Sequence, residues 1–181
     1  MSSPLISIDA HDVAAREPEP PHSESESETT RGPLKMSFVG IESRTRLTTS
    51  FGDVPAHLLR VNDCLRTSDG RFAKIRKIDV LKLDRDFLSF HPHAQPIRIG
   101  AGALAPGLPK QDVYLAPDQT LVVGTSAFEK RSVTAASQMS RPRVVRSPCE
   151  QVAYYRLTLD AEASVLSEKV LLRIEMPSRD A

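Results

Sequence analysis

Turn signals recur about every 8–12 residues along most of this chain, and this spacing constrains its fold more than any other feature. From Met36 onward, short apolar runs alternate with stretches that contain Gly, Pro and Asp. No long amphipathic helix and no internal repeat is evident. Short runs separated by turn residues are typical of strands, so we expect an all-β domain of short antiparallel strands with one or two short helices.

The stretch GDVPAHLLRVND, residues 52–63, predicts a short helical turn. Pro55 suits the first helical position, because its missing N–H would have no partner there. Leu58 and Leu59 are expected to face the core. Asn62 is expected to end the turn in a left-handed conformation, which Asn tolerates better than most residues.

Asp69-Gly70 predicts a hairpin between the strands on either side of it. In the second strand, the apolar phase changes between Ile75 and Ile78, which would place them on opposite faces of a regular strand. We therefore expect a β-bulge or bend between these two residues.

The other apolar runs complete the predicted elements. A first strand pair is expected at 38–49, and further strands at FLSF, PIRI, VYL, VAYYRLTL and KVLLRIEM. The Gly- and Pro-rich stretch at 100–109 is interpreted as a turn. A short helix capped by Ser132 is expected at SVTAASQM.

The N-terminal part differs in composition from the rest. Residues 1–35 are rich in Pro, Ser and Glu and offer little to bury, so we expect an acidic disordered tail, followed by one domain over 36–181. Residues 1–30 hold seven acidic residues and one arginine, whereas the whole chain carries a net charge of +1. The domain itself is therefore basic.

A basic domain raises the alternative of nucleic-acid binding. The candidate residues are Arg71, Lys74, Arg76, Lys77 and Lys82. They alternate poorly onto one face of a strand, and Phe72 is the sole aromatic residue among them that could stack on a base. We therefore do not expect nucleic acid to be the partner.

Neither location nor cofactor leaves a clear mark in the sequence. No apolar run is long enough to span a membrane, and the N-terminus lacks the features of a secretory signal. The cytoplasm is the default location, and signal-independent secretion stays open. Cys64 and Cys149 lie far apart, and HPH at 91–93 has no third ligand nearby, so neither a metal site nor a cofactor is expected.

Three segments, taken in order, resemble the bacterial hedgehog/intein (Hint) domain family over about residues 38–176. The first matches at Thr45, Leu47, Gly52, Val54, Pro55, Leu59, Asp63, Leu65 and Thr67. The second matches at Pro96, Ile97, Ile99, Ala101, Gly102, Ala103, Leu104, Gly107, Pro109, Asp112 and Pro117. The third, VAYYRLTLDAEASVL, resembles the closing strand pair. The resemblance implies a Hint-like horseshoe of twisted strands.

The resemblance also implies a chemistry. In the family, an initial Cys or Ser attacks the preceding carbonyl, and a His in a later turn protonates the departing nitrogen. Counting from Thr45 places the nucleophile at Gly40, and counting from Pro117 places the acid at Gln119. Neither residue can perform the step, so no catalytic residue is expected.

The corner APDQ, residues 116–119, is therefore interpreted as an active-site corner without its acid. We expect a catalytically inactive Hint domain that acts as a structural or interaction module for an unidentified protein partner. Whether the chain is an enzyme is left open. The alternative is self-cleavage near 37–40, for which Ser37, His93 and Asp118 are the weaker candidates.

Overall fold

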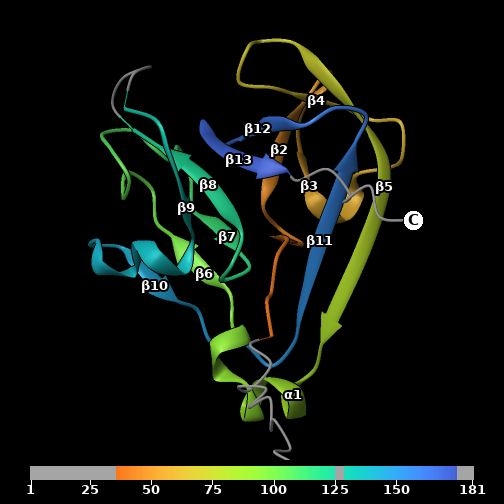
Figure 1. Cartoon of the computed structure of the whole chain (residues 1–181). Helices are drawn as coiled ribbons and strands as arrows, with labels where there is room; N and C mark the ends of the chain where they lie inside the picture. Colours follow the sequence, from red (N-terminus) through yellow and green to blue (C-terminus); the bar gives the residue numbers. More distant parts are fainter. Residues whose placement is uncertain (1–35, 125–128, 175–181) are drawn as a thin grey trace, which may run out of the picture. The chain divides into compact units, whose positions relative to one another are not determined.

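Two antiparallel sheets make up the architecture of this chain in the computed structural model, which describes residues 36–124 and 129–174 (Figure 1). The larger has the order β10-β6-β7-β1-β11-β5-β4-β2-β3, and the smaller β12-β13-β8-β9. The strands are β1 (Ile41–Glu42), β2 (Arg46–Thr49), β3 (Gly52–Pro55), β4 (Cys64–Arg66), β5 (Phe72–Leu83), β6 (Ile97–Ile99), β7 (Val113–Leu115), β8 (Thr120–Val123), β9 (Arg131–Thr134), β10 (Val144–Arg146), β11 (Val152–Leu159), β12 (Ala163–Ser167) and β13 (Val170–Ile174).

The helical elements are short. They are η1 (Ala56–Leu58), α1 (Arg85–Phe90), η2 (Pro92–Ala94) and η3 (Ala136–Ser140). None of the helices in the described part of the chain is long and apolar enough to cross a membrane. Because strands make up most of the regular structure and the helices are short, the all-β prediction is confirmed.

The local predictions around β4 and β5 are confirmed. Strand β4 pairs with β5 around a turn in which Gly70 has a φ of +81°. Thr158 lies opposite Lys77 and Leu159 opposite Ile75, so β5 carries the extra residue of a bulge where the apolar phase changes. Asn62 has a φ of +78°, as expected at the exit of the helical turn.

Five local predictions are wrong. Pro55 precedes η1 as its N-cap, and Leu58 is 57% exposed because only Leu59 turns inward. FLSF lies in α1 and not in a strand, because the Asp84 carboxylate caps a helix there. The strands at 38–49 do not pair with each other, since β1 lies between β7 and β11. Ser132 lies in β9, ahead of η3.

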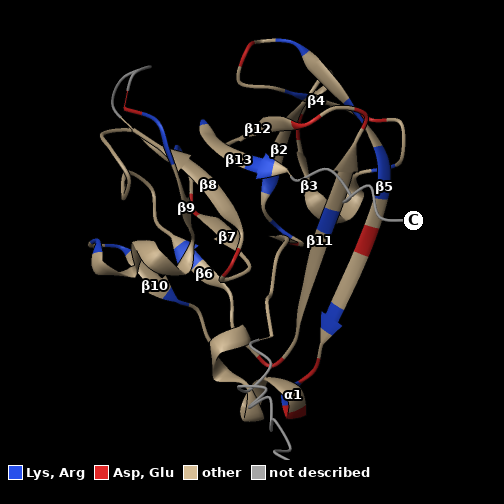
Figure 2. Ribbon diagram, viewed as in Figure 1, with Lys and Arg blue, Asp and Glu red and all other residues tan. Residues whose placement is uncertain are grey.

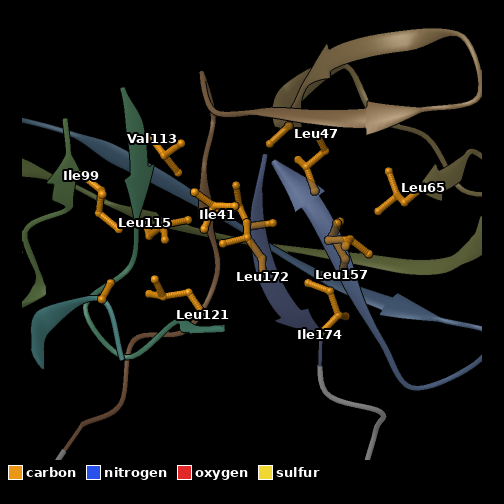
Figure 3. Packing of buried hydrophobic residues seen from close by; sticks show 14 of the residues in the cluster. Ile41, Leu47, Leu65, Ile99, Val113, Leu115, Leu121, Leu157, Leu172 and Ile174 are labelled. Atoms are coloured by element: carbon orange, nitrogen blue, oxygen red, sulfur yellow. The ribbon is translucent and has the colours of Figure 1, made fainter. Parts of the chain in front are cut away.

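The core is aliphatic and joins the two sheets (Figure 3). Leu47 and Leu115 from the larger sheet pack in one cluster with Leu121 and Leu172 from the smaller. Full burial of one such side chain stabilises the fold by about 1.5–3 kcal/mol. A second cluster holds Phe38 and Tyr154 together with residues of α1 and η2. This second cluster positions the start of the described chain.

Candidate functional site

The opening segment, residues 37–40, lies against the corner, residues 116–119. The Ala116 N–H donates to the Gly40 carbonyl over 3.0 Å, and the Asp118 N–H donates to the Phe38 carbonyl over 2.9 Å. The Phe38 N–H donates in turn to the Asp118 carboxylate over 2.8 Å. The structure therefore brings together the two regions that hold the expected family positions of the nucleophile, Gly40, and of the acid, Gln119.

Gly40 packs directly against β11. Its φ is +142°, a conformation that L side chains rarely adopt. A Cβ at this position would lie 3.1 Å from Tyr154 Cβ and 3.2 Å from the Tyr155 carbonyl oxygen. A side chain at this position would therefore be strained and would require a small shift of β11.

Gln119 is 2% exposed and is bound to backbone on several sides. Its Nε2 donates to the Thr120 carbonyl over 3.1 Å and to the Arg173 carbonyl over 2.9 Å. The backbone carbonyl of Gln119 accepts from the Ala135 N–H over 2.9 Å. The amide therefore ties the corner to the end of β13.

The three weaker candidates lie around one residue, Phe38. Ser37 precedes it and is exposed, and Asp118 accepts its N–H. The His93 ring lies with its centroid 5.6 Å from that of Phe38. The N–H that Asp118 accepts belongs to the Ser37–Phe38 peptide, one bond beyond the peptide that a Ser37 hydroxyl would attack.

His91 and His93 belong to an aromatic group with Phe38 and Phe87. The two imidazoles lie edge to face, with centroids 5.5 Å apart and planes at 88°. His91 also stacks on Phe87, which meets Phe38 edge-on. Across residues 36–124 and 129–174, no group of three His, Cys, Asp or Glu residues has a metal-binding arrangement. The rings pack as part of the support for the opening segment.

Cys149 is held by the side chain of Gln95. Gln95 Nε2 donates to the Cys149 carbonyl over 3.1 Å, and Gln95 Oε1 accepts from the Cys149 N–H over 2.9 Å. Partial burial, and then the nearby Glu42 carboxylate, raise the pKa of Cys149. A raised pKa disfavours the thiolate, so this cysteine is a poor nucleophile. Burial likewise raises the pKa of Tyr154, whose hydroxyl donates to the Ala94 carbonyl.

Glu42 is a buried charge beside the site that sequence reasoning missed. It is 5% exposed, and its carboxylate accepts from the Ser43 hydroxyl at 2.8 Å, the Arg44 N–H at 2.9 Å and Arg44 Nε at 3.1 Å. The Arg44 guanidinium also lies over the Tyr114 ring at 4.8 Å. Because β1 has only two residues, no period in the sequence could have identified Glu42 as buried.

The family positions Thr45 and Asp112 have clear structural roles. The Thr45 hydroxyl accepts from the Tyr114 N–H and donates to the Tyr114 carbonyl, each over 2.8 Å. The Asp112 carboxylate accepts from the Ala101 N–H over 2.9 Å and so fixes the start of the 100–109 turn. Both side chains take the place of a backbone partner.

The candidate basic residues lie on β5 and in the turn before it (Figure 2). Two of them form ion pairs with neighbouring acids, Arg71 with Asp69 at 2.5 Å and Lys77 with Asp79 at 2.8 Å. Hydrogen bonds from Thr67 and then Arg71 lower the pKa of Asp69 to about 2, so this carboxylate is charged near neutral pH. These two acids reduce the positive charge of the strand.

Comparison with known proteins gives one family and one fold. The family model described as the Hint domain matches residues 39–173. The splicing domain of the Msm DnaB1 intein, solved with bound zinc, is 13% identical with a TM-score of 0.50, covering 75% of this chain and 99% of its own. The gp41-1 intein is 8% identical with a TM-score of 0.48, covering 74% of this chain and 97% of its own. The MchDnaB-1 intein is 12% identical, with a TM-score of 0.48. The match covers 75% of this chain and 99% of that intein. No curated protein matches the chain.

Proposed function

Because the chain belongs to the Hint domain family, we propose that it is a Hint domain without self-cleaving chemistry, which serves as a structural or interaction module for a protein partner. Counting from Pro117, we infer that residue 119 is the position of the family's proton donor, and the chain has Gln there. An amide cannot protonate a departing nitrogen at neutral pH, because it has no titrating group in that range.

The bonding of Gln119 is the observation that carries this proposal. Its Nε2 hydrogens are engaged by the Thr120 and Arg173 carbonyls, and its side chain is buried. A residue bound in this way stabilises the corner and is not presented to a reacting peptide. The close approach of Gly40 to Tyr154 and Tyr155 and its positive φ support the same proposal, because a side chain there would need a strained backbone and a shift of β11.

The competing function is self-cleavage at Ser37, which the grouping of Ser37, His93 and Asp118 around Phe38 favours. In that reaction the Ser37 hydroxyl attacks the Met36 carbonyl carbon. The bond from that carbon to the Ser37 nitrogen breaks, an ester forms, and the nitrogen takes up a proton. Hydroxylamine would then cleave the ester and release the segment before Ser37.

The intact mass of the full chain, tagged at its N-terminus, separates the two functions. We expect a single full-length mass after incubation with hydroxylamine, with thiol, and with neither, because the acid is missing. A fragment that starts at Ser37 or Gly40 and forms faster with hydroxylamine would overturn the proposal.

The Ser37→Ala variant is the matched control for any fragment. Loss of the fragment in this variant would assign the cleavage to the Ser37 hydroxyl, whereas its persistence would indicate contaminating protease. Nucleic-acid binding, the remaining alternative, would appear as an affinity that falls steeply with salt concentration.

A further inference from the structure

A groove of about 460 Å³ shares no described lining residue with the opening segment or the corner. It is formed by the tight turn at 104–108, the strands β8 and β13, and the start of β9. Its apolar walls are half-buried side chains that leave hydrocarbon open to the groove. These are Leu104, Ala105, Leu108, Val122 and Leu171. The volume falls within the range of small-molecule sites.

The wall at 104–108 is fixed to the rest of the domain. The Leu108 N–H donates to the Ala105 carbonyl over 2.8 Å, and the Leu104 N–H donates to the Leu108 carbonyl over 2.9 Å. Arg141 Nη1 donates to the Leu104 carbonyl over 3.0 Å. The Lys110 N–H donates to the Glu168 carbonyl over 2.9 Å, which joins this wall to the β12–β13 turn. A ligand would therefore meet a preformed wall on this side of the groove.

Positive charge gathers around these apolar walls. The cationic residues that line the groove are Lys130, Arg131, Arg141 and Lys169, and Figure 2 shows basic residues at the start of β9 and at the β12–β13 turn. None of the ion pairs between described residues includes any of the four. Glu129 is the one acidic residue among the described residues of the lining.

One of these cations, Arg141, is held in place by hydrogen bonds to its surroundings. Arg141 donates through Nε to Gln138 over 2.9 Å as well as through Nη1, which leaves further guanidinium N–H groups for a ligand. Lys169 follows Glu168 in a two-residue turn, with φ values of +69° and +48°. Two-residue turns with positive φ at both positions are a common connection in β-hairpins, and this turn carries Lys169 to the edge of the groove.

We propose that this groove binds an amphipathic anion, a carboxylate or phosphate head on an unbranched alkyl chain. The anionic head of the ligand would pair with the four cations, and its alkyl chain would lie along the leucine and valine walls. The described lining includes no aromatic residue on which a nucleotide base could stack. The site shares no residue with the family's catalytic positions and does not depend on the proposed function.

Titration of the full chain, followed by calorimetry and by NMR shifts, tests the proposal. The probes are decanoate, decyl phosphate, decyltrimethylammonium and acetate, each below its micelle concentration. Decanoate or decyl phosphate should bind saturably at one site, with affinity rising up to about fourfold per added methylene. The cationic probe should bind at least about tenfold more weakly, because its charge is opposed by the rim.

The Arg131→Glu, Lys169→Glu double variant should lose about tenfold or more in decanoate affinity. Its matched control is Arg76→Glu, Lys82→Glu on β5, which makes the same change in charge at exposed positions outside the groove. Ala105→Phe should block the space for the ligand's alkyl chain while leaving all four cationic side chains unchanged. Circular dichroism and the melting temperature establish that each variant is folded.

Several outcomes would overturn the proposal. These are no saturable binding of either anion, equal binding of the cationic probe, and equal loss of affinity in the β5 control. A peptide with an apolar C-terminal residue and a free carboxylate that binds more tightly than decanoate would also overturn it, because a protein terminus would then be the occupant.

Discussion

At the scale of single residues, three polar side chains act as substitutes for a neighbouring strand. The Thr45 hydroxyl serves both the N–H and the carbonyl of Tyr114. The Gln95 amide does the same for Cys149, and Gln119 serves two carbonyls at once. Buried backbone groups must find partners, so short strands that do not reach one another need such side chains. This requirement explains polar residues in otherwise apolar surroundings.

The Thr45→Val variant tests this role directly. Valine keeps the shape of threonine but leaves the Tyr114 N–H and carbonyl without their partner, so we expect a loss of about 2 kcal/mol or more in the free energy of unfolding. Urea denaturation measures the loss.

Thr48→Val is the control, because the Thr48 hydroxyl bonds only to the Asp53 carboxylate at the surface. Its stability should change by no more than about 0.5 kcal/mol. Equal effects of the two substitutions would contradict the role given to Thr45.

At the scale of elements, α1 shows how one capping residue changes the structure of an apolar run. The Asp84 carboxylate accepts from the Phe87 N–H over 2.9 Å and starts a six-residue helix where the apolar pattern suggested a strand. The helix then presents Phe87 to Phe38, with ring centroids 6.0 Å apart. The packing of the opening segment thus depends on this cap.

The Asp84→Ala variant should cost about 1 kcal/mol, the usual effect of removing an N-cap. Asp86→Ala is the matched control, because Asp86 lies in the first turn without being the N-cap, and its loss should cost only about 0.3 kcal/mol. Thermal unfolding of both variants gives the comparison. Similar melting temperatures for the two would show that the cap does not stabilise α1.

At the scale of the whole molecule, distant segments meet at the site. Phe38 and Asp118 are 80 residues apart in the chain, and Gln119 bonds to a residue 54 positions away. The core cluster likewise draws its side chains from both sheets. The described residues thus share their buried apolar side chains between strands that are distant in the chain.

We propose that the acidic residues 1–35 add nothing to this stability, since their composition offers little to bury. A chain that begins at Met36 should therefore melt within about 2 °C of the full chain in a thermal scan. A clearly lower melting temperature would show that the N-terminal residues take part in the fold.

The sequence by itself determined the local structure around turns. Asp69-Gly70, Asn62 and the change of apolar phase in β5 each predicted a feature that the structure confirms, because a turn or bulge depends on the conformations of a few adjacent residues. The order of short motifs was also enough to identify the family.

Only the tertiary structure decided what the site residues contact. Sequence counting named Gly40 and Gln119, but it could not show that Gly40 lies against Tyr154 or that Gln119 binds the Arg173 carbonyl. Nor could it find the groove or the burial of Glu42. Such contacts join residues far apart in the chain, and they depend on the pairing and packing of several strands together, which no single stretch of sequence specifies.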